Sequence, residues 1–130
     1  MRAFNRVLID QFRANGGRLS GPMEGRQLML LTTKGARSGE QRTVVIGYRP
    51  HGAAFAVIAS DNGAPKSPAW YHNLIADPTA TAEVGPDKFK VRARVAGPEE
   101  RPELAEKIEY LAPQQALTSR EIPIVVLERI

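Results

Sequence analysis

Residues 30–43 read Leu30-Leu31-Thr32-Thr33-Lys34-Gly35-Ala36-Arg37-Ser38-Gly39-Glu40-Gln41-Arg42-Thr43. An apolar, strand-like run ends here in a short loop bounded by Gly35 and Gly39, and a second strand is predicted to begin near Arg42. Backbone amides of a glycine loop, together with a forked arginine side chain, suit the oxygens of a phosphate or carboxylate. The segment is not a nucleotide-binding P-loop, because no Gly-Lys-Ser/Thr follows. It therefore indicates an anion-binding turn, with an ordinary glycine-bearing hairpin as the alternative.

A second informative stretch covers residues 59–74 and reads Ala59-Ser60-Asp61-Asn62-Gly63-Ala64-Pro65-Lys66-Ser67-Pro68-Ala69-Trp70-Tyr71-His72-Asn73-Leu74. The turn at residues 62–65 leads into a helix predicted over residues 69–76, an arrangement that can receive an anion at the helix start. The alternative is a turn that simply starts a helix. The mixture of aromatic and polar side chains at the start of this helix is typical of a half-polar pocket wall, although aromatics are more often core. His72 is expected to be an exposed helical residue.

The remaining patterns predict one domain over residues 1–130. Strands are expected at about 27–33, 42–48, 53–60, 79–84, 88–95 and 122–127, and helices at 1–15, 69–76 and 98–110. Residues 50–52 read as a turn, and residues 122–127 are so uniformly apolar that a central strand is predicted. Short turns join most strands, which favours a mostly antiparallel sheet. The predicted fold class is α+β, with about six strands in a small barrel and the helices outside.

Composition narrows the function. The chain has 130 residues, no cysteine and two histidines, which excludes disulfides and thiolate sites and argues against any metal site. Residues 1–50 carry nine Lys or Arg against three acidic residues, a formal charge of +6 that indicates an anionic partner or merely a solubilising surface. No aromatic residue lies on the face of strand 88–95 that carries its basic side chains, so a nucleic-acid partner is not expected. No Ser/His/Asp motif or carboxylate pair is visible for hydrolysis.

The first helix has two interpretations. Its apolar stripe of Phe4, Val7, Leu8 and Phe12 is flanked by arginines. Such a helix can rest on an anionic lipid surface, as a lid or a peripheral membrane contact. Alternatively, it packs on the barrel or on a second subunit. No signal peptide or membrane span is apparent, so the expected location is cytoplasmic, with peripheral contact to the inner face of the membrane under the lipid interpretation.

Several segments together resemble the nitroreductase-like family of deazaflavin-dependent oxidoreductases. They cover almost the whole chain: residues 12–17, 30–42, 60–73, 77–85 and 120–128. The resemblance implies a split β-barrel of the flavin-reductase or FMN-binding type that binds coenzyme F-420. The reduced ring of this cofactor donates hydride to an acceptor that the protein positions.

The resemblance also implies which residues contact the cofactor. The two glycine loops would hold the phosphate and glutamate tail, and the strand after the first loop, with the start of the second, would line the ring. Ser60 would orient the ring or the acceptor as the one catalytic candidate, and Tyr110 would border the substrate. The expected cofactor-binding residues are Thr32, Arg37, Ser38, Gly39, Arg42, Thr43, Val44, Ile46, Ala59, Ser60, Asn62, Gly63, Ala64, Lys66, Ala69, Trp70, Tyr71 and Asn73.

Three positions depart from the family pattern. Ala36 stands where many members have arginine, which removes one contact to the tail. Asp61-Asn62 replaces a common Lys-Gly pair and places an anion near an anionic cofactor, unless Asp61 points outward. The stretch 110–117 keeps one tyrosine of a tyrosine-rich loop that usually borders the substrate, and it is about two residues shorter, which puts reduction of nitroimidazole-type compounds in doubt.

These observations lead to a main hypothesis and two alternatives. The main hypothesis is an oxidoreductase that uses reduced coenzyme F-420 to transfer hydride to a small electrophilic acceptor: a quinone, an enone or a nitroaromatic. The alternatives are a non-catalytic protein that carries the deazaflavin and an FMN-binding split-barrel protein. A homodimer is compatible with each of them.

Overall fold

The computed structural model describes residues 3–19, 21 and 24–130, and of residues 3–5 the backbone alone. Its seven strands form one antiparallel sheet in the order β2-β1-β5-β6-β7-β4-β3. The strands are β1 (Leu28–Lys34), β2 (Gln41–Gly47), β3 (Arg49–His51), β4 (Ala54–Ile58), β5 (Thr79–Val84), β6 (Asp87–Val95) and β7 (Ile124–Arg129). The helices are α1 (Ala3–Ala14), α2 (Ala69–Ala76), α3 (Arg101–Lys107) and α4 (Leu111–Gln115).

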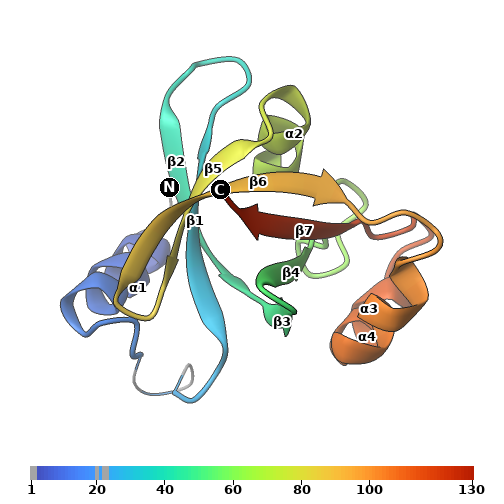
Figure 1. Ribbon diagram of the computed structural model, residues 1–130, viewed down its shortest axis with the longest axis horizontal. Coiled ribbons are helices and arrows are strands. Elements are labelled where there is room, and N and C mark those ends of the chain that lie inside the picture. Colours follow the sequence, from blue (N-terminus) through green and yellow to red (C-terminus); the bar gives the residue numbers. More distant parts are fainter. Residues whose placement is uncertain (1–2, 20, 22–23) are drawn as a thin grey trace.

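The sheet curls into a half-barrel. In Figure 1, β1 and β2 run from top to bottom, whereas β6 and β7 run from side to side. Right-handed twist, accumulated over seven strands, produces this change of direction. The predicted small antiparallel α+β barrel is confirmed, and β7 is central as predicted, because it lies between β6 and β4.

The inner face of the curled sheet packs on α2. Trp70 and Leu74 of this helix join Met29 and Leu31 of β1 and Val125 of β7 in one buried group. The helix has the predicted bounds and ends at Asp77, whose backbone is extended because Pro78 follows.

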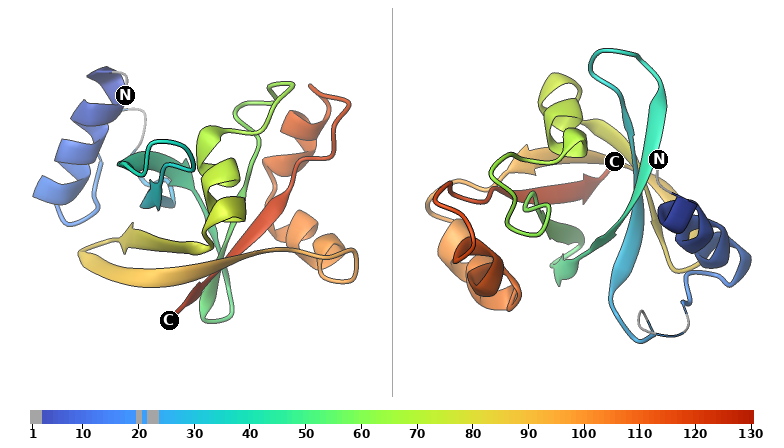
Figure 2. Two further views of the ribbon diagram at one scale, coloured as in Figure 1. Left: turned by 90° about the horizontal axis from the view of Figure 1, so that it is seen from above. Right: turned by 180° about the vertical axis from the view of Figure 1, so that it is seen from behind.

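The outer face is covered at two places. Helix α1 packs on Leu30 of β1 and Val45 of β2, while α3 and α4 pack on Ile124 and Val126 of β7. Figure 2 shows these two coverings on opposite sides of the molecule. Strands β1 and β7 are therefore buried on both faces, which explains why their sequences are nearly unbroken apolar runs.

Two predicted elements differ in the structure. Pro50 and His51, predicted as part of a turn at 50–52, belong to the short strand β3, which pairs with β4. Pro50 is tolerated there because β3 is an edge strand and needs no further ladder partner. The helix predicted over 98–110 is shorter in the structure: α3 ends where Ile108 leaves the helical region with ψ of 82°, and a second helix that was not predicted, α4, follows it. This break lets Ile108 and Leu111 reach the same buried group as Leu104.

The apolar stripe of α1 belongs to the core. Leu8 and Phe12 are 8% and 1% exposed, and Arg13 donates two hydrogen bonds to the nearly buried carboxylate of Glu83 on β5, at 3.1 and 2.9 Å. The prediction of a free, lipid-facing stripe is therefore wrong for these two side chains, while Val7 is 53% exposed. The Phe4 side chain lies outside the described residues.

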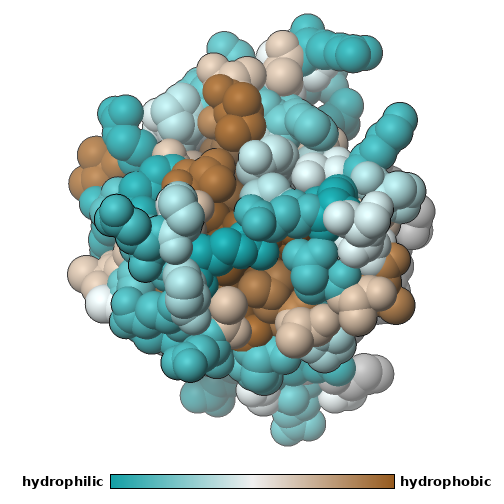
Figure 3. Space-filling view, turned by 90° about the vertical axis from the view of Figure 1, so that its right-hand side faces the viewer, coloured by the Kyte–Doolittle hydropathy of each residue, from teal (hydrophilic) through white to brown (hydrophobic). Residues whose placement is uncertain are grey.

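The surface is mixed. Figure 3 shows the side of the molecule that carries α3 and α4 as largely hydrophilic, with separate apolar patches between polar side chains. In the part of the chain that the structure describes, no helix combines the length and apolarity needed to cross a bilayer.

Candidate functional site

The β1–β2 loop is a tight, self-bonded turn. Gly35 donates its N–H to the carbonyl of Glu40 at 2.7 Å, and Gly39 donates to Gly35 at 2.9 Å. The Ser38 hydroxyl accepts the N–H of Glu40 at 3.1 Å. Ser38, predicted to contact the cofactor, therefore also stabilises the turn. Arg37 lies exposed at the tip. The loop thus has a fixed backbone and one free-standing cation.

Asn73 fastens this loop to α2. Its Nδ2 donates to the hydroxyl of Thr33 at 3.0 Å, and its Oδ1 accepts the N–H of Ala36 at 3.0 Å. The side chain is 7% exposed, so both ends of the amide are used within the protein. We infer that Asn73, expected from the sequence as a cofactor contact, acts on the site by holding the loop in place.

The second loop contains consecutive left-handed residues. Asp61, Asn62 and Gly63 have φ values of 53°, 56° and 75°. Ala64 donates its N–H to the carbonyl of Asp61 at 3.1 Å, and the buried Ser60 hydroxyl accepts the N–H of Gly63 at 2.9 Å. Aspartate and asparagine tolerate this region better than most side chains. The turn therefore accommodates Asp61-Asn62 in place of the Lys-Gly pair expected from the resemblance, and Asp61 is exposed.

Arg120 lies behind this loop and was missed by sequence reasoning as a functional residue. Its guanidinium donates to the carbonyls of Ala59, Ser60, Ala64 and Lys66 at 3.1, 2.8, 3.0 and 3.3 Å, and to the Ser67 hydroxyl at 3.2 Å. The available signal is a lone arginine directly before a buried strand. No local pattern connects it to a loop more than 50 residues away.

The stretch 110–117 borders the second loop, as expected for a substrate wall, but forms the helix α4 and the residues after it. A Cβ placed on Gly63 would lie 2.6 Å from Cβ of Leu117 and 3.0 Å from the carbonyl oxygen of Gln114. Leu117 is 68% exposed at this contact. The structure therefore brings an apolar side chain to the edge of the loop.

Tyr110 lies farther along the same wall, against β2. Its hydroxyl is covered and has no hydrogen-bond partner among the described residues, and it packs on Gly47. Burial raises the pKa of Tyr110, and the Arg49 guanidinium lies 4.8 Å from the ring centroid. The hydroxyl is thus neutral at physiological pH.

The expected cofactor contacts on β1 and β2 divide between the two faces of the sheet. Val44 and Ile46 pack against the inner buried group that contains Trp70, which is 6% exposed. Thr32 and Thr43 lie on the outer face, where their hydroxyls are 2.7 Å apart and bond to each other. The structure therefore gathers the apolar candidates around α2 and separates these two threonines from them.

Charges flank both loops. Arg42 forms an ion pair with Glu40 at 3.0 Å, but the two side chains are 56% and 66% exposed, so the pair is weak. Lys66 is exposed on the second loop. Three cations, Arg37, Arg42 and Lys66, are therefore available to an anion.

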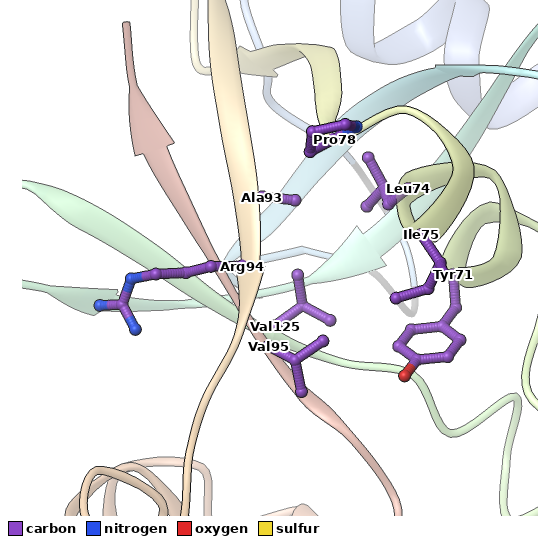
Figure 4. A pocket seen from close by; sticks show the side chains of 8 residues that line it. All are labelled: Tyr71, Leu74, Ile75, Pro78, Ala93, Arg94, Val95 and Val125. Atoms are coloured by element: carbon purple, nitrogen blue, oxygen red, sulfur yellow. The ribbon is translucent and has the colours of Figure 1, made fainter.

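An apolar cavity of about 140 Å³ lies beside α2 (Figure 4). The guanidinium of Arg94, one of its lining residues, points away from the apolar side chains in this view. The other lining residues are Tyr71, Leu74, Ile75, Pro78, Ala93, Val95 and Val125. Tyr71 thus belongs both to the predicted cofactor wall and to this cavity.

Comparison with known proteins gives a consistent result. The family model described as F420H2-dependent quinone reductase matches residues 4–129. A curated F420H2-dependent quinone reductase of Mycobacterium tuberculosis is 36% identical over 127 residues, which cover 91% of this chain and 85% of that protein.

Solved structures agree. An F420-H2 dependent reductase, FDR-A, is 34% identical to this chain and superposes with a TM-score of 0.70. The match covers 79% of this chain and 95% of the FDR-A chain. A structure described as a domain-swapped dimer is 30% identical with a TM-score of 0.73, and the match covers 95% of this chain and 96% of that one. A protein of Listeria innocua described as a pyridoxamine 5'-phosphate oxidase shares the fold at 12% identity and a TM-score of 0.57, covering 94% and 93%. The split-barrel prediction is confirmed.

Proposed function

We propose a quinone as the hydride acceptor, because the chain belongs to the family of F420H2-dependent quinone reductases and is an oxidoreductase that uses coenzyme F-420. Among the three acceptor classes expected from the sequence, the family description favours the quinone over an enone or a nitroaromatic. The exposed Leu117 at the edge of the second loop supports this choice, since a quinone ring presents a flat apolar surface.

The residues present suit the cofactor. Bound F-420 in its reduced form supplies the hydride. Its anionic tail requires cations and amides, which Arg37, Arg42, Lys66 and the two glycine loops offer. Its planar ring requires an apolar wall, for which Val44, Ile46 and Trp70 are the candidates. Tyr110, expected to border the substrate, packs instead with the α3 and α4 group on the outer face.

The observation that carries this proposal is that both glycine loops are preformed. Asn73 holds the first, and Arg120 together with Ser60 holds the second. A loop that is already ordered loses little conformational entropy when a ligand binds. On this view Ser60 acts by positioning Gly63. The N–H groups of Gly39, Gly63 and Ala64 are used within the turns, so the backbone amides of Ser38 and Asn62 are the ones that face the tail. Ala59, Ala69 and Tyr71 complete the wall.

Fluorescence titration tests the proposal. We expect F-420 to bind more tightly than FMN, and reduced F-420 to be oxidised by a water-soluble quinone only when the protein is present. Equal or tighter binding of FMN would support an FMN protein instead. Tight F-420 binding without any acceptor reduction would support a carrier.

A homodimer is a further proposal. The similar structure described as a domain-swapped dimer supports it, as do Ile75 and Val95 beside the apolar cavity, which are 60% and 45% exposed. Light scattering coupled to size exclusion would report the mass, and a monomer at all accessible concentrations would exclude it. The expected cytoplasmic location remains a prediction.

A further inference from the structure

The contacts of Arg120 determine which way the peptide groups of the second loop face. Its guanidinium collects the carbonyl oxygens of Ser60 and Lys66, at 2.8 and 3.3 Å, on one side of the loop. In a trans peptide unit the C=O and the following N–H point in opposite directions, and the described backbone has no cis peptide bond. The N–H groups of Asp61 and Ser67 are therefore directed away from Arg120.

Two features keep Arg120 itself in place. Gln115 of α4 donates from Nε2 to the carbonyl of Arg120 at 2.6 Å, and its Oε1 accepts the N–H of Ile122 at 2.9 Å. The guanidinium thus approaches the loop from a segment that is fastened to the α4 side of the molecule. The backbone that carries Arg120 is therefore held by contacts outside the loop.

The loop needs such a support, because residues 61–63 occupy the left-handed region. Non-glycine residues in this region are strained and persist only where their surroundings hold them. Ser60 accepts one amide of the turn, while Arg120 binds carbonyls on both sides of it. Without the guanidinium, these carbonyls would lose charge-assisted partners and the loop could relax.

We propose that Arg120 is a positioning residue that gives the loop its polarity for anions. It turns carbonyl oxygens inward and amide N–H groups outward, and it adds a fixed positive charge behind them. This inference rests on the proposed function, in which the loop receives the anionic tail of F-420. It predicts that Arg120 affects recognition of the tail much more strongly than recognition of the ring, whose expected wall includes Ala59.

The test compares two probes, F-420 and 8-hydroxy-5-deazariboflavin, which has the ring and its ribityl chain but no anionic tail. Arg120→Met is expected to weaken F-420 binding about tenfold or more and to weaken binding of the tail-less probe much less. Arg120→Lys keeps the charge without the planar fork and should give an intermediate loss. Arg101→Met is the matched control, because it removes the same charge from a half-buried arginine whose carboxylate partner lies 3.9 Å away.

Hydrogen exchange supplies a readout that does not involve the cofactor. In Arg120→Met, faster exchange should be confined to the loop around residues 59–67. If Arg120→Met does not fold, the same comparison is made with Arg120→Lys. An equal fold-loss of affinity for both probes, or no loss for either, would overturn the inference. Failure of the wild-type protein to bind F-420 would instead overturn the proposed function.

Discussion

Gly63 has two separate reasons to be glycine. Its φ of 75° is unfavourable for any L side chain, and a Cβ would lie 2.6 Å from Cβ of Leu117. Gly52 has a similar φ of 59° but no atom within 4 Å of such a Cβ. The two positions therefore separate backbone strain from steric exclusion.

We expect Gly52→Ala to cost about 1 kcal/mol of unfolding free energy from the left-handed conformation alone. Gly63→Ala should cost roughly 1–3 kcal/mol more, because the loop and Leu117 must move apart. Urea unfolding of both variants measures the difference. Equal losses would mean that the Gly63 contact is not tight.

Tyr110 carries a covered hydroxyl without a partner among the described residues. The Tyr110→Phe substitution removes this hydroxyl and should raise the unfolding free energy by about 1 kcal/mol, since a buried hydroxyl that makes no hydrogen bond is costly. F-420 affinity should stay unchanged. Thermal unfolding and titration check both expectations, and a loss of stability would show that the hydroxyl has a partner. A lower kcat/KM for quinone with unchanged stability would instead place the hydroxyl on the acceptor.

Arg37 and Arg42 are the cations expected at the tail. Arg37→Ala and Arg42→Ala should each weaken F-420 binding about ten- to a hundredfold, the range for a charge-assisted contact. The loss should shrink at high salt because of screening. Glu40→Gln is the control: it removes an anion and releases Arg42 from its exposed ion pair, so binding should tighten. Wild-type affinity in both arginine variants would place the tail elsewhere.

At this scale the sequence predicted the loops better than the roles within them. Glycine positions, hydroxyls and cations mark a loop because their chemistry is local. Asn73 and Arg120 act through partners about 40 to 60 residues away. A single sequence does not reveal such distant pairs, so Arg120 was overlooked and Asn73 was expected to face the ligand.

Helix α1 shows what periodicity reveals about an element and what it does not. Of the predicted stripe, Leu8 and Phe12 are buried and Val7 is exposed, while Ile9, outside the predicted stripe, is buried. Amphipathicity does not say which surface covers such a stripe. In the structure Phe12 is 1% exposed among Leu8, Leu19 and Leu30. The cover is therefore the protein's own sheet.

Two substitutions on α1 distinguish core from surface. Phe12→Ala should reduce the unfolding free energy by about 3–5 kcal/mol, the usual cost of removing a buried aromatic ring. Val7→Ala is the matched control, because Val7 is 53% exposed, and it should change stability by less than about 0.5 kcal/mol. Denaturant unfolding measures both. A small effect for Phe12 would revive the lipid-facing interpretation.

The bounds of some other elements are set by neighbouring residues in the sequence, whereas those of others depend on tertiary contacts. Helix α2 was predicted to the residue, because Pro68 starts it and Asp77-Pro78 ends it. The break between α3 and α4 was not predicted, since Ile108 is compatible with a helix. Its non-helical conformation follows from burial with Leu104 and Leu111, a tertiary effect. Strand β3 depends likewise on pairing with β4.

Over the whole molecule, an ion-pair network joins the α3–α4 unit to the sheet. Glu100, at the start of α3, bonds to Arg94 of β6 and to His51 of β3, with 2.9 Å from Arg94 Nη2 to Glu100 Oε2 and 3.1 Å to His51 Nε2. Arg94 also bonds to Glu128 of β7, and Lys107 of α3 lies 3.0 Å from His51 Nδ1. One carboxylate therefore connects segments that are far apart in the chain.

This network predicts the acid limb of the stability profile. The hydrogen bond from Arg94, followed by that from His51, lowers the pKa of Glu100 from its ordinary 4.5 to about 2. A carboxyl whose pKa is lower in the folded state stabilises the fold fully above its unfolded pKa. This contribution is lost as the pH falls through the folded value.

The difference in unfolding free energy between wild type and Glu100→Gln should thus be constant near neutrality and shrink between about pH 5 and 2. Glu106→Gln, on an exposed position of α3, should run parallel to wild type. Urea unfolding across this range measures all three proteins, and a constant gap down to pH 2 would show that Glu100 is not held by these partners.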